Sequence, residues 1–167
     1  MRELSFNDLC LNPISVIADT WLLITAGNKE NGYNAMTASW GHIGNVWGKP
    51  SICVYIRPRR YTKQFVDSGE LFTVSVMGEK YQKEMAYIGS HSGKDEDKLS
   101  KVGFHPIFLD GTTAVEDAEL IFICRKLYRA PIMEECFVDS TIPEEHYPDK
   151  DFHDMYVGEI LKILVKD

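Results

Sequence analysis

Residues 28–40 read Asn28-Lys29-Glu30-Asn31-Gly32-Tyr33-Asn34-Ala35-Met36-Thr37-Ala38-Ser39-Trp40. The Asn-Gly pair in this stretch is a strong signal for a hairpin turn, and the residues after it predict a strand. Successive side chains of a strand point to opposite faces. Ala35, Thr37 and Ser39 then form a small, hydroxylated face that suits close contact with a ligand. The opposite face, formed by Met36, Ala38 and Trp40, supplies bulk for a core. The alternative is an ordinary amphipathic strand whose polar face lies in water.

The rest of the chain predicts a mainly β protein with few helices. The strands are predicted at Thr20–Thr25, Tyr33–Trp40, Ser51–Arg57, Leu71–Val76, Glu119–Tyr128 and Tyr156–Val165, with a weaker one at Met133–Asp139. The helices are predicted at Tyr61–Ser68, Glu79–Ile88 and Glu96–Val102. Consecutive strands with short turns favour antiparallel pairing, and a small barrel protects its edges. A doubly wound parallel sheet needs helices between most strands, so this pattern excludes it.

A burst of positive charge follows the third predicted strand. Arg57, Arg59, Arg60 and Lys63 fall within seven residues of a chain whose net charge is −7. Pro58 disfavours continuing the strand, and a helix is expected to begin just after it. Guanidinium groups match phosphate geometry, and a helix start favours an anion. The segment therefore predicts a phosphate site, with a solvated basic turn as the alternative.

The bulk composition limits the classes of protein and partner. With 167 residues, 44% of them hydrophobic and 26% charged, the chain suits a single domain over residues 1–167. The negative charge argues against nucleic acid or an anionic membrane as partner. No apolar run is long enough to cross a bilayer, and the first residues do not resemble a secretory signal, so we expect a cytoplasmic protein. The four cysteines are widely spaced, which argues against disulfides and structural zinc.

Two later segments are candidates for contact with a ligand. Gly89–Lys98 is a loop rich in serine and glycine, whose backbone could follow the edge of a ligand; a plain polar connection is the alternative. His153 stands just before the last predicted strand, where it faces either a pocket or solvent. The histidines and aspartates of residues 146–156 have no spacing typical of a metal site, so no metal is expected. Rossmann and P-loop nucleotide motifs are absent from the sequence.

In order and spacing, these segments resemble the flavin reductase-like family, which has the FMN-binding split-barrel fold. The resemblance rests on residues 34–40, Arg57-Pro58 with Tyr61-Thr62, Ser92–Asp95 with Asp97-Lys98, and His153 ahead of Gly158-Glu159-Ile160. It implies an antiparallel Greek-key split barrel with a few peripheral helices that works as a homodimer. It also implies FMN as cofactor. The cofactor-binding residues that follow are Asn34, Ala35, Met36, Thr37, Ser39, Trp40, Arg57, Arg60, Tyr61, Thr62, Ser90, Ser92, Gly93, Asp95 and Lys98.

The resemblance also implies an activity. The expected function is an NAD(P)H-dependent flavin or ferric reductase that passes electrons to a small-molecule or protein acceptor. His153 is the one catalytic candidate, either contacting the nicotinamide or, as a protonated imidazole, stabilising anionic reduced flavin. Two alternatives stay open: a non-enzymatic FMN electron carrier of the flavoredoxin kind, and a binding module for another phosphorylated or haem-like ligand.

Overall fold

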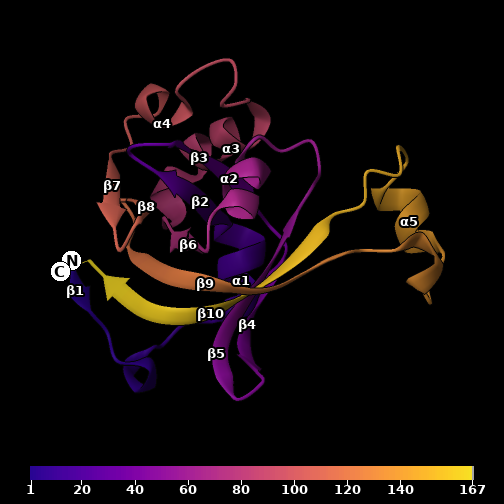
Figure 1. Cartoon of the computed structure of the whole chain (residues 1–167), viewed down its shortest axis with the longest axis horizontal. Helices are drawn as coiled ribbons and strands as arrows, with labels where there is room; N and C mark the ends of the chain where they lie inside the picture. The colour runs from indigo at the N-terminus through magenta and orange to yellow at the C-terminus, as the bar shows by residue number, and fades with distance from the viewer. Residues whose placement is uncertain (167) are drawn as a thin grey trace.

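A computed structural model of the chain describes residues 1–166, and antiparallel sheet forms most of its regular structure (Figure 1). The strands are β1 (Arg2–Glu3), β2 (Leu22–Asn28), β3 (Gly32–Ala38), β4 (Gly41–Val46), β5 (Lys49–Ile56), β6 (Leu71–Val76), β7 (Pro106–Leu109), β8 (Thr112–Val115), β9 (Leu120–Pro131) and β10 (Asp154–Val165). The main sheet has the order β3-β2-β6-β9-β10-β5-β4, with β1 added to β10. The sheet curls so that edge strand β3 also contacts β5.

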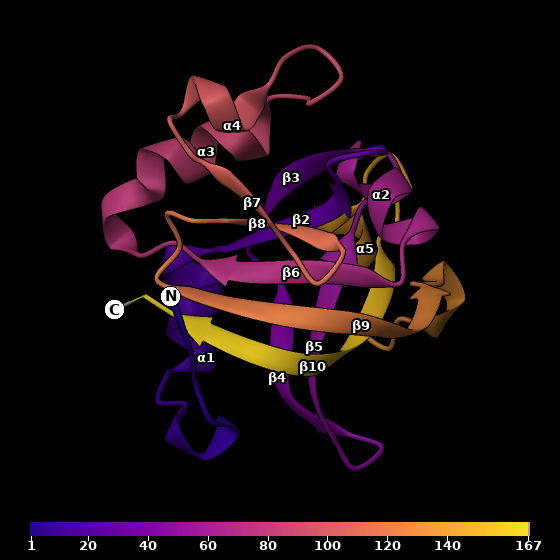
Figure 2. The same cartoon turned by 60° about the vertical axis from the view of Figure 1, so that its left-hand side comes forward.

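The helices are short and lie around this sheet. They are α1 (Pro13–Ser15), α2 (Thr62–Ser68), α3 (Gln82–Ser90), α4 (Lys98–Lys101) and α5 (Thr141–His146), with shorter 3-10 turns and one π-helical turn over Val16–Thr20. Figure 2 shows α3 and α4 together on one side, above the small β7-β8 hairpin. Within residues 1–166, the structure has no helix long and apolar enough to cross a membrane.

The alternation of side chains along the strands separates two apolar cores. On β2, Leu22 and Ile24 enter the core inside the curled sheet, whereas Leu23 joins a second core beneath α3 and α4. On β9, Phe122 likewise enters the core inside the curled sheet, and Ile123 enters the second core. Because both faces of these strands are buried, their sequences are almost continuously apolar. The curled sheet is therefore stabilised by two apolar cores, one inside the curl and one beneath α3 and α4.

The expected fold class is confirmed: the protein is mainly β, antiparallel, with few helices. The predicted strand Leu71–Val76 has the observed bounds of β6, and the predicted turn joins β2 to β3. Trp21 has a positive φ of 63°, which separates the π-helical turn from β2, so β2 begins later than Thr20. The glycine-rich β4 and the short β7 and β8 are strands that the sequence did not predict.

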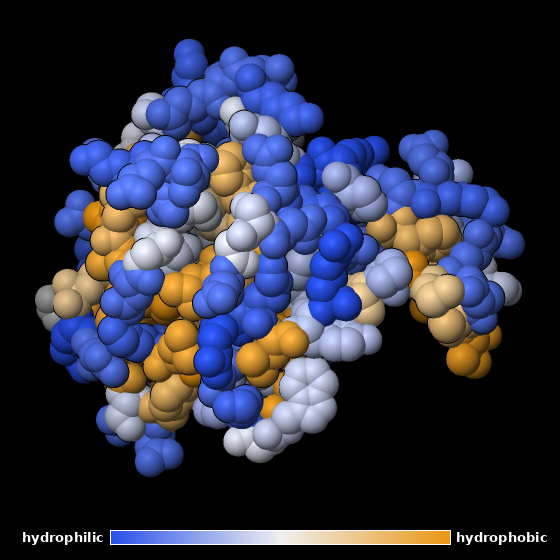
Figure 3. Space-filling model, in the orientation of Figure 1, coloured by the Kyte–Doolittle hydropathy of each residue, from blue (hydrophilic) through white to orange (hydrophobic). Residues whose placement is uncertain are grey.

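The predicted strand Met133–Asp139 is wrong. Residues 134–136 form a 3-10 turn, and β9 already ends at Pro131, opposite Asp154 at the start of β10. The intervening residues 132–153, here called the arm, leave the sheet and carry α5. The backbone N–H of Ile132 donates to the carbonyl of His153 (2.9 Å) and closes the base of the arm. Figures 1 and 3 show the arm as a lobe that stands apart from the rest of the molecule.

Candidate functional site

Two adjoining chambers lie where β3, α2, the end of α3 and the arm approach one another. The first, here the Trp40 chamber, has a volume of about 200 Å³ and is lined by Met36, Thr37, Ala38, Ser39, Trp40, Tyr55, Arg57, Arg60 and His153. The second, here the Lys98 chamber, has about 320 Å³ and is lined by Asn34, Met36, Arg59, Arg60, Tyr61, Thr62, Gly89, Ser90, His91, Ser92, Gly93 and Lys98. Met36 and Arg60 line both, so the two chambers lie side by side.

The Lys98 chamber contains two cations that lack an acidic partner. Arg60 donates to the carbonyl of Gly89 (2.5 Å), and the buried Lys98 ammonium donates to the carbonyl of Ile88 (3.0 Å). Among residues 1–166, neither of the two forms a salt bridge. Burial and the charge of Arg60 lower the pKa of Lys98 to about 8, although Glu96 opposes this. Two charges held together against their own repulsion favour an anion between them.

The loop after α3 packs tightly on β3 beside these cations. Asn34 donates from its side-chain amide to the hydroxyl of Thr62 (2.9 Å), and both side chains are buried. A Cβ added to Gly93 would lie 2.0 Å from the amide oxygen of Asn34, so the loop reaches β3 only because residue 93 is glycine. The helix α2 has only seven residues, so its dipole adds little. Positive charge in the chamber comes mainly from Arg60 and Lys98.

The other cation near the start of α2 serves the fold. Lys63 bridges Asp67 (2.6 Å) and Asp154 (2.9 Å), and its side chain is only 12% exposed. Tyr156 donates its hydroxyl proton to Asp67 (2.6 Å), while Arg129 pairs with Asp154 (2.7 Å). Despite burial, Lys63 and Arg129 lower the carboxyl pKa of both aspartates, and the hydrogen bond from Tyr156 adds to the effect at Asp67. The network ties α2 to β9 and β10, and so fixes the position of the Lys98 chamber.

Aromatic side chains enclose the Trp40 chamber. The rings of Trp40 and His153 lie 5.0 Å apart between centroids, and Tyr147 of the arm hydrogen-bonds the Nδ1 atom of His153 (2.8 Å). Burial and the charges of Arg57, Arg60 and Arg59 lower the pKa of His153 to about 4, against the opposing effect of Asp151. His153 is therefore neutral near pH 7. Burial and the neighbouring arginines disfavour a protonated imidazole in this structure, and its protonation beside an anionic reduced flavin stays a prediction.

Arg57 faces the arm. Its guanidinium hydrogen-bonds Asp151 and the carbonyl of His146 (2.9 Å), and it lies 5.1 Å from the ring centre of Tyr147. Arg59 adds a longer contact to Asp151 (3.3 Å). In this arrangement Arg57 holds the arm against the end of β5, at the wall of the Trp40 chamber. Its contribution to a phosphate site stays a prediction.

The structure brings most of the predicted site residues together. The residues that line one or both chambers are Asn34, Met36, Thr37, Ser39, Trp40, Arg57, Arg60, Tyr61, Thr62, Ser90, Ser92, Gly93, Lys98 and His153. Two others line a neighbouring hollow instead: Ala35, which packs into the core beneath α3, and Asp95 on the loop before α4.

Some of the predicted hydrogen-bonding groups already have partners within the protein. Thr37 donates to the carbonyl of Met85 in α3 (2.6 Å), so a helix covers the hydroxylated face of β3 at this residue, whereas Ser39 stays exposed. The hydroxyl of Ser90 bonds the carbonyl of Ala86 (2.9 Å). Trp40, expected in the core, lies past the end of β3 and is 37% exposed. It thereby serves as a wall of its chamber.

The cofactor-binding residues expected from the resemblance left out Ala38, Tyr55, Arg59, Gly89 and His91, although the last three lie in segments that the sequence marked as candidates. Tyr55 lies between buried Val54 and Ile56 on β5, and this alternation would have placed its ring on the outer face, beside the strand end. The helical glycine Gly89 would meet Thr37 at 3.4 Å if it carried a Cβ. Such a packing contact gives no signal in a single sequence.

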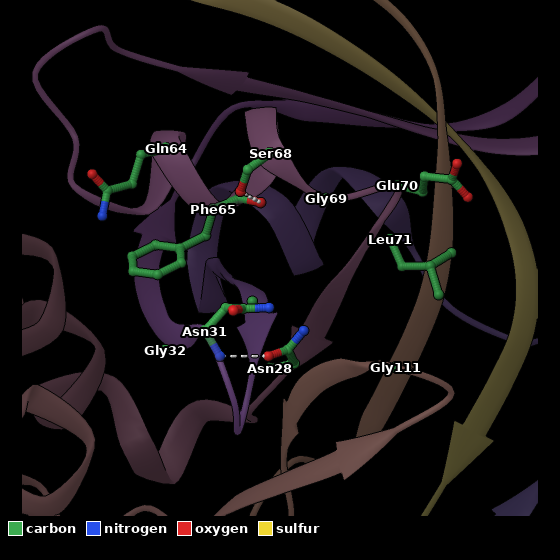
Figure 4. A pocket seen from close by; sticks show the side chains of 11 residues that line it. Asn28, Asn31, Gly32, Gln64, Phe65, Ser68, Gly69, Glu70, Leu71 and Gly111 are labelled. Atoms are coloured by element: carbon green, nitrogen blue, oxygen red, sulfur yellow. Dashed lines mark hydrogen bonds between the residues drawn. The ribbon is translucent and has the colours of Figure 1, made fainter.

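A separate cavity of about 620 Å³ lies at the far end of α2 (Figure 4). Phe65 projects into it, and Asn28 accepts a hydrogen bond from the backbone of Asn31 (2.8 Å) on its floor. Among the residues that the structure describes, the lining of this cavity includes the acidic Glu70 and no basic side chain. This cavity is larger than either chamber but is unsuited to a phosphate.

Comparison with solved structures identifies the fold. Flavoredoxin of Desulfovibrio vulgaris (Miyazaki F) is 20% identical, with a TM-score of 0.69 over 99% of this chain and 78% of that chain. A candidate flavin reductase with a split barrel domain from Shewanella frigidimarina NCIMB 400 is 17% identical, with a TM-score of 0.70 over 89% and 67% of the two chains. An FMN-binding protein from Thermus thermophilus with bound p-hydroxybenzaldehyde is 19% identical, with a TM-score of 0.68 over 100% and 83%. The expected split barrel is thus confirmed.

Sequence comparison gives the family. None of the curated proteins is similar enough to match this chain. The model of the flavin reductase like domain, in contrast, matches residues 14–167, which include both chambers, the loop after α3 and the arm. The protein therefore belongs to the flavin reductase-like family.

Proposed function

We propose that the protein binds FMN noncovalently, with the phosphate in the Lys98 chamber and the flavin ring toward the Trp40 chamber. The observation that carries this proposal is the pair of cations, Arg60 and Lys98, that face one chamber without a salt bridge. A dianionic phosphate would accept charge-assisted hydrogen bonds from both. The adjoining chamber, with Trp40, Tyr55 and the backbone of β3, suits a flat ring. Membership of a flavin reductase-like family supports the same assignment.

Each group in the site then has a physical role. Arg60 and Lys98 bind the phosphate, and Gly93 lets the loop after α3 close beside it. Met36 lies where the chambers meet, at the junction between ring and phosphate. When bound, the flavin supplies hydride and electron transfer, and the protein supplies position, electrostatics and access. No nucleophile from the protein is required for such chemistry.

We propose further that the protein is an NAD(P)H-dependent flavin or ferric reductase. The exposed Trp40 and the neutral His153 at the outer end of the chamber support access for a second molecule there. A non-enzymatic electron carrier is the second candidate, favoured by the similarity in fold to flavoredoxin. A small molecule or a protein would take up the electrons in either case.

A homodimer is part of this proposal. A groove of about 670 Å³ between the arm and the barrel is lined largely by apolar side chains, including Ile14, Ile43 and Ile142. Ile14 is 78% exposed, and Val138 of the arm is fully exposed. A second copy would cover such surface. Light scattering is expected to give twice the 19.1 kDa mass of the chain, and a monomer that binds FMN normally would contradict the dimer.

The binding proposal is tested by the absorbance spectrum of the purified protein and by titration with FMN. Flavin absorbance, or saturable quenching of added FMN fluorescence, is expected. The absence of binding at tens of micromolar FMN would overturn the proposal. Arg60→Ala is expected to weaken FMN about ten-fold or more, because a charge-assisted hydrogen bond is worth about 1.5–3 kcal/mol.

Anaerobic addition of NADH or NADPH then distinguishes the two activities. A reductase is reduced rapidly, and steady-state oxidation of NAD(P)H accelerates when free flavin or a ferric chelate is added. An electron carrier keeps its flavin and shows little turnover with either acceptor. Slow reduction by both nucleotides, with FMN firmly bound, would leave the carrier as the function and exclude the reductase.

A further inference from the structure

The arm brings one buried hydroxyl to the candidate catalytic histidine. Tyr147 follows α5 directly, and its phenol oxygen lies 2.8 Å from the Nδ1 atom of His153. Tyr147 is 4% exposed and His153 is 8% exposed, so water does not compete for this hydrogen bond. Phe152 packs on the Tyr147 ring at 4.8 Å between centroids, and Arg57 covers it at 5.1 Å. The tyrosine is thus held firmly in place.

The direction of this hydrogen bond follows from its surroundings. Burial raises the pKa of Tyr147, and Asp151 adds to the effect, while the charge of Arg57 opposes it. The phenol keeps its proton at neutral pH. Within residues 1–166, Nδ1 of His153 is the one hydrogen-bond partner of this buried phenol, so the phenol proton is satisfied only when it points toward Nδ1. The His153 ring is neutral, and a neutral imidazole that accepts at Nδ1 carries its hydrogen on Nε2.

The other ring nitrogen of His153, Nε2, is available to a ligand in the Trp40 chamber. Within residues 1–166, no protein group hydrogen-bonds Nε2 of His153, and the residue lines the Trp40 chamber beside Tyr55 and Arg57. Trp40 packs against the ring at 5.0 Å and limits its rotation. A neutral N–H donor in a partly dry chamber is suited to an uncharged acceptor such as a carbonyl oxygen.

We propose that Tyr147 is a positioning residue: it fixes His153 as a neutral Nε2–H donor that binds a carbonyl oxygen of the reacting molecule in the Trp40 chamber. The arm therefore completes the site from outside the barrel. This inference rests on the proposed function for the identity of the reacting molecule. The tautomer itself depends only on the protein.

The first test needs no flavin. Long-range ¹⁵N–¹H NMR spectra of the full chain at pH 7 are recorded for wild type, Tyr147→Phe and the control Tyr128→Phe, whose tyrosine is 44% exposed and outside both chambers. Wild type and control are expected to show protonated Nε2 and unprotonated Nδ1 at His153. Tyr147→Phe is expected to show a mixture of both tautomers. A protonated Nδ1 in wild type, or an unchanged tautomer in Tyr147→Phe, would overturn the proposal.

The second test measures function. Phenylalanine keeps the ring that packs on Phe152, so the variant retains the arm. In stopped-flow experiments, Tyr147→Phe is expected to slow flavin reduction by NAD(P)H about ten-fold, equivalent to about 1.4 kcal/mol, while FMN affinity stays within two-fold. An unchanged rate with normal FMN binding would overturn the positioning role. Failure of wild type to bind FMN would overturn the proposed function instead, and the NMR result would still decide the tautomer.

Discussion

The barrel and the arm are built in opposite ways. In the barrel, strands such as β2 and β9 bury both faces, and their side chains form two apolar cores. The arm, residues 132–153, has few buried side chains and is attached through individual polar contacts: Arg57 with Asp151, and the base hydrogen bond from Ile132. The comparison teaches that stability comes from the barrel, while the arm is a local structure that supplies Tyr147 and one wall of the site.

The largest expected difference concerns stability. Phe122 is completely buried in the barrel, so Phe122→Ala is expected to lower the free energy of unfolding by about 3–5 kcal/mol. Val138 of the arm is fully exposed, and Val138→Ala is expected to change the free energy of unfolding by less than about 0.5 kcal/mol. Urea denaturation measures both. Similar losses for the two variants would show that the arm is part of the cooperative core.

The next largest effect separates the arm from the barrel. Arg57→Gln removes the charge that holds Asp151, and cleavage within residues 132–153 by a protease is expected to accelerate about ten-fold, equivalent to about 1.4 kcal/mol of anchoring. Arg59→Gln is the matched control, because Arg59 is 66% exposed and contacts the same carboxylate only at 3.3 Å. Mass spectrometry locates the cuts. First cuts in the barrel, or equal acceleration in both variants, would contradict this division.

A smaller effect concerns the pH dependence of FMN binding. Lys98 attracts the phosphate only while protonated, and its pKa in the protein is about 8. The phosphate itself is fully ionised above about pH 7. The dissociation constant for FMN is therefore expected to rise above pH 8, by up to about ten-fold per pH unit, and to stay flat below it. Fluorescence titrations from pH 7 to 9.5 measure the curve. Lys98→Met should abolish the dependence, and an identical curve in that variant would assign it to another group.

The smallest effect tests the loop after α3. Gly93→Ala places a methyl group against Asn34, whose amide donates to Thr62, so one hydrogen bond beside the phosphate is disturbed. FMN affinity is expected to fall about five-fold, and the free energy of unfolding is expected to fall by about 1 kcal/mol because the Asn34–Thr62 hydrogen bond is buried. Gly44→Ala on β4, where an added Cβ meets nothing within 4 Å, serves as control. Unaltered FMN binding by Gly93→Ala would place the phosphate away from this loop.

The same contrast explains which elements the sequence could predict. Strands β6 and β9 have alternating or continuous apolar runs, and this pattern is sufficient to predict a strand from the sequence. The arm also contains apolar residues, such as Met133 and Val138, but they have no sheet partner because β9 has ended at Pro131. Periodicity carries no information about a missing partner. The weak strand predicted at Met133–Asp139 failed for this reason.

The candidate site was predictable where motifs carry charge or small residues. Arg60 and Thr62 were expected near a phosphate, Gly93 and Lys98 were expected to contact the cofactor, and all four line one chamber. The neutral state of His153 and the role of Tyr147 were beyond the sequence, because both depend on burial and on a contact within the folded arm. The sequence also gave no sign that Arg57 pairs with Asp151, because this contact too forms only in the folded arm.

The central claim is that Arg60 and Lys98 bind the phosphate of FMN, and calorimetric titration with FMN and riboflavin tests it most directly. Wild type is compared with Lys98→Met and with Lys101→Met, which removes an exposed lysine from the same helix α4. We expect wild type and Lys101→Met to bind FMN at least about ten-fold more tightly than riboflavin, and Lys98→Met to lose most of that preference while its riboflavin affinity stays unchanged. Equal affinities for FMN and riboflavin in wild type, or parallel losses of both in Lys98→Met, would contradict the claim.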